Sequence, residues 1–145
     1  MTLEELTALE AIKQLKARYF RCMDTKDWRG WGEVFAEDAT MFVEHGVERA
    51  PEAQSHGPVA GRANIVAYVR TAVDAALTVH HGHMPEIEIT SPSEARGVWA
   101  MEDIVELPGG RTLHGHGHYH ETYVVEGGAW RIKSLHLTRL RVRRT

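Results

Sequence analysis

The sequence has only one cysteine, Cys22, among its 145 residues, and it has no long apolar run. One cysteine excludes an intrachain disulfide, and the apolar surroundings of Cys22 favour a small core residue in a reducing compartment. No segment approaches the roughly 20 apolar residues that a membrane helix needs, and the first residues, MTLEELTALE, are acidic and amphipathic rather than an export signal. We therefore expect a cytoplasmic protein without membrane contact.

The chain also lacks a large excess of charge of one sign. With a formal net charge of -3, it has no overall electrostatic attraction to nucleic acid. The C-terminal stretch RLRVRRT is locally basic, but no set of stacking aromatic residues accompanies it. The length is typical of one domain whose core needs neither a disulfide nor a metal for stability. We predict a single domain over residues 1–145 that binds no nucleic acid.

Apolar residues at intervals of three or four predict helices in the first half of the chain. The first helix should run from about Leu3 to Met23, and its apolar stripe should be buried along its whole length. This stripe comprises Leu3, Leu6, Leu9, Ile12, Leu15, Tyr19, Cys22 and Met23. A short second helix is predicted from Trp28 to Phe35, and a third over residues 61–76.

Strands are predicted in the rest of the chain. Residues 40–44 should form a strand, and the Gly, Pro and polar residues after it (46–61) predict a loop that serves as an entrance flap. Four further strands, joined by short turns, should cover residues 78–90, 95–107, 111–126 and 130–142. A change of parity among the last apolar positions indicates a bulge near Lys133. Helices followed by a meander favour an α+β fold with one sheet face covered by helices.

The strand HGHGHYHE places every second residue on one face. His114, His116, His118 and His120 share that face. With Glu121 and Gly128 they nearly match the first metal-binding motif of cupins, but the second histidine motif of cupins is missing. We therefore predict no metal, and we interpret the histidines as a polar face at solvent or at a subunit contact. Gly115, Gly117 and Tyr119 lie on the opposite face, where the glycines would leave room for a ligand and Tyr119 would contact it.

Tyr19, Asp24 and His80 form the main candidate site. Taken singly, Asp24 is typical of a turn or a helix cap, Tyr19 of a core aromatic residue and His80 of a structural histidine. If Asp24 and His80 are paired, Asp24 would accept a hydrogen bond from the ring N–H of His80 and fix the tautomer of the ring. The other ring nitrogen would then be free to transfer a proton near neutral pH.

Two charged residues in later strands are candidates for the wall of the same site. Asp103 is either a second carboxylate at this wall or a charged residue in an exposed strand. Arg139 shares a strand face with Arg141 and Arg143, which is typical of a solvated strand end. After the bulge, however, Arg139 follows Leu135 and Leu137 on the inward side, so an inward orientation is the alternative.

Four stretches of the sequence resemble the SnoaL-like branch of the nuclear transport factor 2-like superfamily. They are EAIKQLKARYFRCMDTKDW, VHHGHMPEIEI, GVWAMEDIVE and GGAWRIKSLHLTRLRV. Within this superfamily the chain is most similar to the bile acid 7α-dehydratases, whereas scytalone dehydratases and hexachlorocyclohexane dehydrochlorinases are more distant. The resemblance implies a cone-shaped, curved antiparallel sheet packed with three helices, a cystatin-like roll that encloses a pocket.

The resemblance also implies roles for particular residues. Matched by motif, His80 would carry the proton, Asp24 would orient it, and Tyr19 would donate a hydrogen bond to a substrate oxygen. Asp103 and Arg139 would bind substrate. The resemblance further implies no metal or organic cofactor, a small hydrophobic cyclic substrate, and a homo-oligomer, with a trimer favoured over a dimer.

The leading hypothesis for function is a cofactor-independent dehydratase, a hydro-lyase that eliminates water from a hydroxylated cyclic or steroid-like ketone by His/Asp acid–base catalysis. A ketosteroid-type isomerase or a polyketide cyclase would use the same pocket, because both reactions begin with proton abstraction beside a carbonyl. A non-catalytic small-molecule-binding domain is the third alternative. One fold and one dyad serve several chemistries, so the sequence does not select the substrate.

Overall fold

The computed structural model describes residues 1–46 and 57–145. Its elements are α1 (Leu3–Asp24), α2 (Trp28–Glu33), β1 (Phe35–Val43), β2 (Val59–Ala60), α3 (Arg62–Val73), β3 (Leu77–Ser91), β4 (Glu94–Glu106), β5 (Thr112–Glu126) and β6 (Ala129–Arg144). Most of the predicted entrance flap (46–61) lies outside the described residues, and its role stays a prediction. The last part of this stretch contains the short strand β2, where only a loop was expected.

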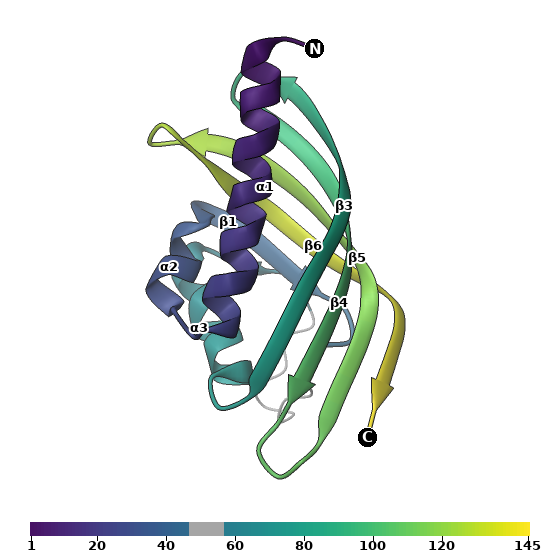
Figure 1. Ribbon diagram of the computed structural model, residues 1–145. Coiled ribbons are helices and arrows are strands. Elements are labelled where there is room, and N and C mark those ends of the chain that lie inside the picture. The colour runs from purple at the N-terminus through teal and green to yellow at the C-terminus, as the bar shows by residue number, and fades with distance from the viewer. Residues whose placement is uncertain (47–56) are drawn as a thin grey trace.

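The six strands form one curved sheet in the order β2-β1-β6-β5-β4-β3. Strands β3 to β6 form the predicted antiparallel meander. The sheet is mixed rather than purely antiparallel, because β1 pairs with β6 in the parallel direction. All three helices lie against the concave side of the sheet (Figure 1). The α+β fold with a curved sheet and three helices in its N-terminal half is thereby confirmed.

The second helix is shorter than its apolar spacing predicted. It ends at Glu33, and Phe35 opens β1 instead of continuing the helix. The Ile132 N–H donates a hydrogen bond of 2.8 Å to the carbonyl oxygen of Val34, and Phe35 pairs with Ile132. Pairing with a distant strand therefore overrides the local helical pattern.

Helix α1 matches its predicted range but is not buried along its whole length. A capping box of Thr2 and Glu5 begins it, with hydrogen bonds of 2.9 and 3.1 Å between each side chain and the other residue's backbone N–H. Leu3 is 75% exposed and Leu6 is 51% exposed, contrary to the prediction. The first buried residue of α1 is Ala8, so its first turns extend past the packed part of the helix.

Two bulges interrupt the pairing of β5 with β6. At the first, Thr122 pairs with Ser134 and the next residue, Tyr123, pairs with Ile132. At the second, Gly117 pairs with Arg139 and the preceding residue, His116, pairs with Arg141. The first irregularity leaves Lys133 as the extra residue, which confirms the predicted bulge. The second, which was not predicted, leaves Leu140 as the extra residue, and Leu140 is 76% exposed.

The second bulge decides the orientation of the C-terminal arginines. A single extra residue reverses the alternation of side chains across a strand. The side chain of Arg139 is only 4% exposed, whereas Arg141 and Arg143 are exposed. The prediction that these three arginines share one face is therefore wrong. Gly117 permits the bulge, since a Cβ there would lie 1.9 Å from the carbonyl oxygen of Thr138.

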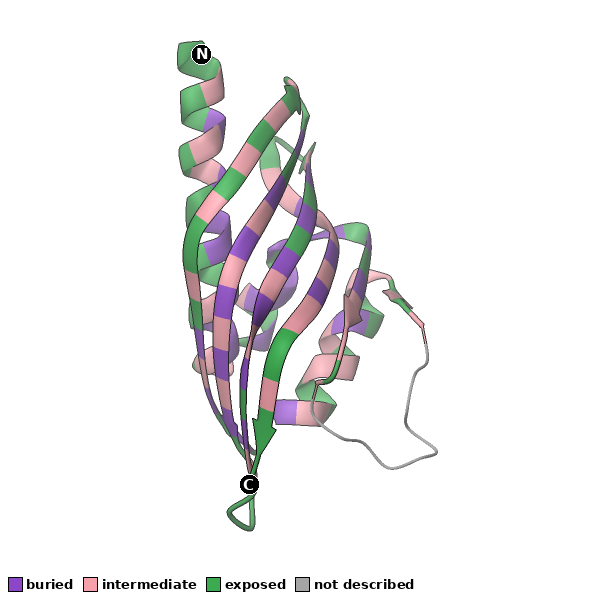
Figure 2. Ribbon diagram, turned by 90° about the vertical axis from the view of Figure 1, so that its right-hand side faces the viewer, coloured by how far each residue is buried: buried purple, intermediate pink, exposed green. Residues whose placement is uncertain are grey.

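Buried and less buried residues alternate along the central strands (Figure 2). The inward residues of β4 and β5 pack against α1 and the other helices in one apolar core, which includes Ile12, Trp31, Trp99 and Tyr123. The histidines of β5 are among its outward residues, as predicted. Among the described residues, no helix is both long and apolar enough to cross a membrane.

Candidate active site

Asp24 and His80, which lie 56 positions apart in the sequence, are in direct contact. Asp24 is the last residue of α1, and His80 lies near the start of β3, beside that end of the helix. The distance from His80 Nδ1 to Asp24 Oδ1 is 2.7 Å. Since an ionised carboxylate only accepts hydrogen bonds, Nδ1 carries a hydrogen, and in the neutral ring Nε2 is the acceptor.

Two further donors hold the Asp24 carboxylate in place. The backbone N–H of His80 donates to Asp24 Oδ2 at 2.8 Å, and the hydroxyl of Thr78 donates to Oδ1 at 2.9 Å. Burial alone raises the pKa of Asp24, but the hydrogen bonds and charge of His80 outweigh it, so the pKa lies below its usual value. Asp24 is thus an ionised acceptor. It does not cap the second helix; Asp27 does so by accepting a hydrogen bond from the Gly30 N–H.

His80 lines a pocket between the concave side of the sheet and the helices. The pocket contains about 700 Å³ not filled by protein atoms, including space that opens to solvent. Its wall is mostly apolar, with Met23, Met41, Val69, Val105 and Leu137 among the lining residues. The polar lining residues are Tyr19, Tyr68, His80, Asp103, Tyr119 and Arg139. An apolar cavity with a few convergent polar groups is typical of a site for a small, largely hydrophobic molecule.

Tyr19 and Tyr119 place two phenols in the pocket wall. Both residues are buried, and their rings meet edge to face with centroids 5.7 Å apart. Each phenol also affects the pKa of the other. Burial raises the pKa of each phenol well above its usual value, so both stay protonated and can donate hydrogen bonds.

Asp103 and Arg139 form a buried ion pair that also lines the pocket. Arg139 Nη1 lies 2.7 Å from Asp103 Oδ1, and Nη2 lies 3.0 Å from Oδ2, a bidentate arrangement. The alternative of Asp103 as an exposed strand residue is wrong. A Cβ on Gly115 would lie 2.3 Å from Arg139 and 2.5 Å from Asp103. Gly115 therefore leaves room for this ion pair, rather than for a ligand as expected.

Sequence reasoning missed a second buried ion pair, between Lys16 and Glu121. Lys16 Nζ lies 2.7 Å from Glu121 Oε2, and both side chains are fully buried. The ammonium also lies 3.7 Å from the ring centroid of Tyr19 and 3.5 Å from that of Tyr119. Burial lowers the pKa of Lys16 to about 8, although Glu121 opposes this shift. The sequence did contain an indication of this pair, because Lys16 lies at helical spacing between Ile12 and Tyr19, on the apolar stripe of α1.

The outer face of the sheet holds the histidines of β5. His114, His118 and His120 are exposed or half-buried there, on the side away from the pocket. Among the described residues, one group on this face could hold a metal ion, and it consists of Glu102, His114 and His116. Glu121, the carboxylate of the cupin-like motif, is fully buried and lies against Lys16. The geometry of that motif is therefore not formed.

The chain belongs to the SnoaL-like domain family, whose model matches residues 4–136. This membership confirms the resemblance seen in the sequence and agrees with the nuclear transport factor 2-like architecture described above.

Individual relatives carry names of several reactions. "Probable cyclase FGR4" from Gibberella zeae is 27% identical over 92% of this chain and 91% of its own length. The crystal structure of a type 2 hexachlorocyclohexane dehydrochlorinase has a TM-score of 0.82 and 16% identity, and covers 99% of this chain and 92% of its own. A Δ5-3-ketosteroid isomerase from Mycobacterium sp. has a TM-score of 0.69 and 20% identity, over 93% and 98% of the two chains. These structures share the fold with this chain.

Proposed function

We propose that the protein is a dehydratase that removes water from a hydroxylated cyclic or steroid-like ketone, using only its own side chains. The observation that carries this proposal is the Asp24–His80 contact of 2.7 Å at the wall of an apolar pocket. A carboxylate behind an imidazole fixes the tautomer, so that Nε2 serves as a base. Asp24 does not line the pocket, and it acts as a positioning residue through His80.

In the proposed reaction, His80 Nε2 removes a proton from a carbon made acidic by the carbonyl, directly or through a conjugated double bond. The electrons of the C–H bond move toward the carbonyl oxygen and then form the new C=C bond as the C–O bond of the hydroxyl breaks. The leaving oxygen takes the proton from the imidazolium, so the products are the unsaturated ketone and water. One imidazole thus acts first as base and then as acid, each role being worth about 10² to 10⁴ in rate.

The phenols and the ion pair have supporting roles in this proposal. Tyr19 would donate a hydrogen bond to the carbonyl oxygen as it gains negative charge, with the Tyr119 ring packed against the Tyr19 ring. The Arg139 guanidinium, held by Asp103, would add positive charge on the same wall and orient the substrate. Beside low-dielectric apolar walls, such fixed donors stabilise developing charge more than they would in solution.

The experiment is incubation of the purified protein with a 7α-hydroxy-3-oxo-4-ene steroid. Dehydration extends the conjugated system, so we expect absorbance to appear at longer wavelength and a product lighter by one water in mass spectrometry. His80→Ala is the matched negative control. If the wild-type protein gives no product with this steroid or with smaller hydroxylated cyclic ketones, the dehydratase proposal is wrong.

A cyclase or isomerase is the second candidate, and the relative named as a cyclase favours it. Both reactions begin with the same proton abstraction, so the dyad would serve them without change. A Δ5-3-ketosteroid separates isomerisation from dehydration, since it has no hydroxyl to lose and gains a conjugated enone only by moving its double bond. Normal ligand binding by His80→Ala and Asp24→Asn, with no turnover by wild type, would instead indicate a non-catalytic binding domain.

We also propose a homotrimer, as the family resemblance implies. Light scattering coupled to size-exclusion chromatography measures the mass directly. Three times the 16.3 kDa chain mass is expected, whereas twice that mass would indicate a dimer.

A further inference from the structure

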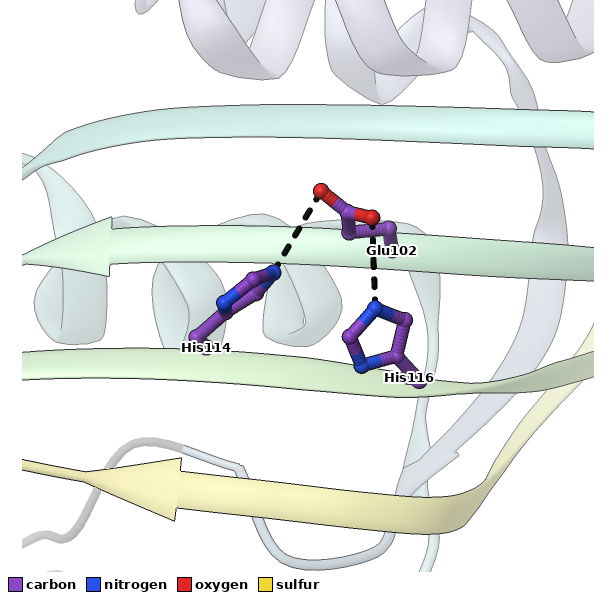
Figure 3. Close-up of side chains that lie close together, drawn as sticks. All are labelled: Glu102, His114 and His116. Carbon is purple, nitrogen blue, oxygen red and sulfur yellow. Dashed lines mark hydrogen bonds and ion pairs between the residues drawn. The ribbon is translucent and has the colours of Figure 1, made fainter.

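The outer face of the sheet carries a side-chain group that the proposed reaction does not use. Glu102 projects from β4, and His114 and His116 project from the neighbouring strand β5, with one imidazole nitrogen of each directed at the carboxylate (Figure 3). His114 Nε2 lies 3.3 Å from Glu102 Oε1, and His116 Nε2 lies 3.2 Å from Oε2. Their side chains are 32% to 45% exposed, so an ion reaches them from solvent.

We propose that Glu102, His114 and His116 bind a divalent transition-metal ion, with Zn²⁺ as the best match. Zinc takes imidazole nitrogen and carboxylate oxygen at bond lengths of about 2.0–2.2 Å, and a tetrahedral site then separates its ligand atoms by about 3.3 Å. Each histidine nitrogen already lies at about this distance from one of the two Glu102 oxygens. One ligand atom from each residue lies within 4.8 Å of the others.

The strand pairing preorganises the three ligands. Glu102 pairs directly with His116 across the β4–β5 ladder, and His114 is two residues from His116 on the same face. Sheet backbone holds such residues more precisely than a loop does. Three protein ligands leave at least one coordination position, which water or a side chain of a second molecule would fill.

The surroundings of the site limit its affinity. Arg141 pairs with His116 and Arg143 pairs with His114 on the next strand, so two cationic residues stand beside the site. The ligands are partly exposed, and His116 Nδ1 has no hydrogen-bond partner among the described residues. In high-affinity metal sites, the second ring nitrogen of a histidine ligand usually donates a hydrogen bond to a neighbouring group. We therefore expect binding weaker than at a buried structural zinc site.

The competing explanation is that Glu102 only accepts hydrogen bonds from two histidines. Calorimetric titration of untagged, chelator-treated full-length protein with Zn²⁺ distinguishes the two. One ion per chain is expected, and His114→Ala/His116→Ala should weaken binding by at least about a hundredfold, since loss of even an indirect partner costs 10–100-fold. Glu102→Gln should weaken it as well. The matched control is His118→Ala/His120→Ala, which removes two histidines from the same face of the same strand and should leave affinity unchanged.

Cobalt(II) gives a second measurement, because coordination by this set produces visible d–d absorption that the His114→Ala/His116→Ala variant should lose. Melting temperatures in chelator show whether the variants fold. The site lies on the opposite face from the pocket, so His80→Ala should bind Zn²⁺ like wild type. Two results would overturn the proposal: no Zn²⁺ binding by folded wild type, or an equal loss of binding in both double variants, which would indicate diffuse attraction to the histidine-rich face.

Discussion

The two faces of the sheet use histidine in opposite ways. On the concave side, the His80 side chain is 7% exposed and is fixed by Asp24 at 2.7 Å. On the outer side, His114 is 45% exposed and lies 3.3 Å from Glu102. On the concave side, the polar groups of the site are paired and enclosed by apolar residues; on the outer side, they meet water. Burial and a fixed partner, rather than the presence of histidine, mark the face suited to proton transfer.

The buried and half-buried acidic side chains on the concave side have partners. An unpaired charge in an apolar interior is costly, so Asp24, Asp103 and Glu121 each have a basic or hydrogen-bonding partner. Outer-face ion pairs are partly exposed, and each contributes little to stability. Substitutions should therefore have large effects on the concave side and small effects on the outer side.

The largest effect is expected from His80→Ala, which removes the proposed proton carrier. We predict a fall of about 10⁴ in kcat/KM for dehydration of the hydroxy-ketone, because one group supplies both acid and base. The matched outer-face variant, His118→Ala, should keep wild-type activity. Similar losses in the two variants, or none in His80→Ala, would contradict the contrast between the faces. Absorbance of the unsaturated product provides the measurement.

Lys16→Met should give the largest change in stability. The substitution leaves Glu121 buried without its cationic partner, and we expect the free energy of unfolding to fall by about 3–5 kcal/mol. Urea denaturation measures this change. The double variant Lys16→Met/Glu121→Leu, which removes both charges, should recover much of the loss. A single variant as stable as wild type would show that Lys16 is not charged in the folded protein.

Asp24→Asn should act on turnover through His80. We expect kcat to fall by about 10² to 10³ with KM little changed, since Asp24 does not line the pocket. Asp27→Asn is the matched control: Asp27 caps α2, and asparagine is an equally good cap. That control should retain wild-type kcat. A rise in KM alone for Asp24→Asn would mean that this residue binds substrate instead.

The smallest effect is a pH dependence of stability from Asp24. Its pKa is lowered in the folded protein, so the carboxylate stabilises the fold above the unfolded pKa, which is about 3.9, and this contribution is lost as pH falls through the folded value. Wild type should lose more unfolding free energy than Asp24→Asn between pH 5 and pH 3. Urea titrations at the two pH values measure this loss. If wild type and Asp24→Asn lose the same unfolding free energy, Asp24 does not contribute to the pH dependence of stability.

Periodicity in the sequence was enough to predict most of the fold. Repeats of three or four residues predicted α1, and alternation predicted the meander and the bulge at Lys133, because each pattern reflects one continuous buried face. The start of β1 at Phe35 was not predictable in this way, because pairing with β6 decides it. Nor was the bulge at Leu140, since arginines and apolar residues alternate through it without a break.

The candidate site was predictable only in part. The family resemblance selected Asp24 and His80, and the structure brings them together, but their catalytic roles stay predictions. Lys16 was missed because a lysine on an apolar stripe is usually taken to extend into solvent. Glu102 was missed as a neighbour of the histidines because cross-strand register cannot be read from one strand alone.

The central claim is that Asp24 holds His80 in one tautomer with Nε2 free toward the pocket. Nitrogen-15 NMR of the imidazole ring measures this directly at neutral pH. For wild type we predict a protonated Nδ1 and an unprotonated Nε2, with the preference weakened in Asp24→Asn. A proton on Nε2 in the neutral ring, or a spectrum that Asp24→Asn leaves unchanged, would contradict the claim.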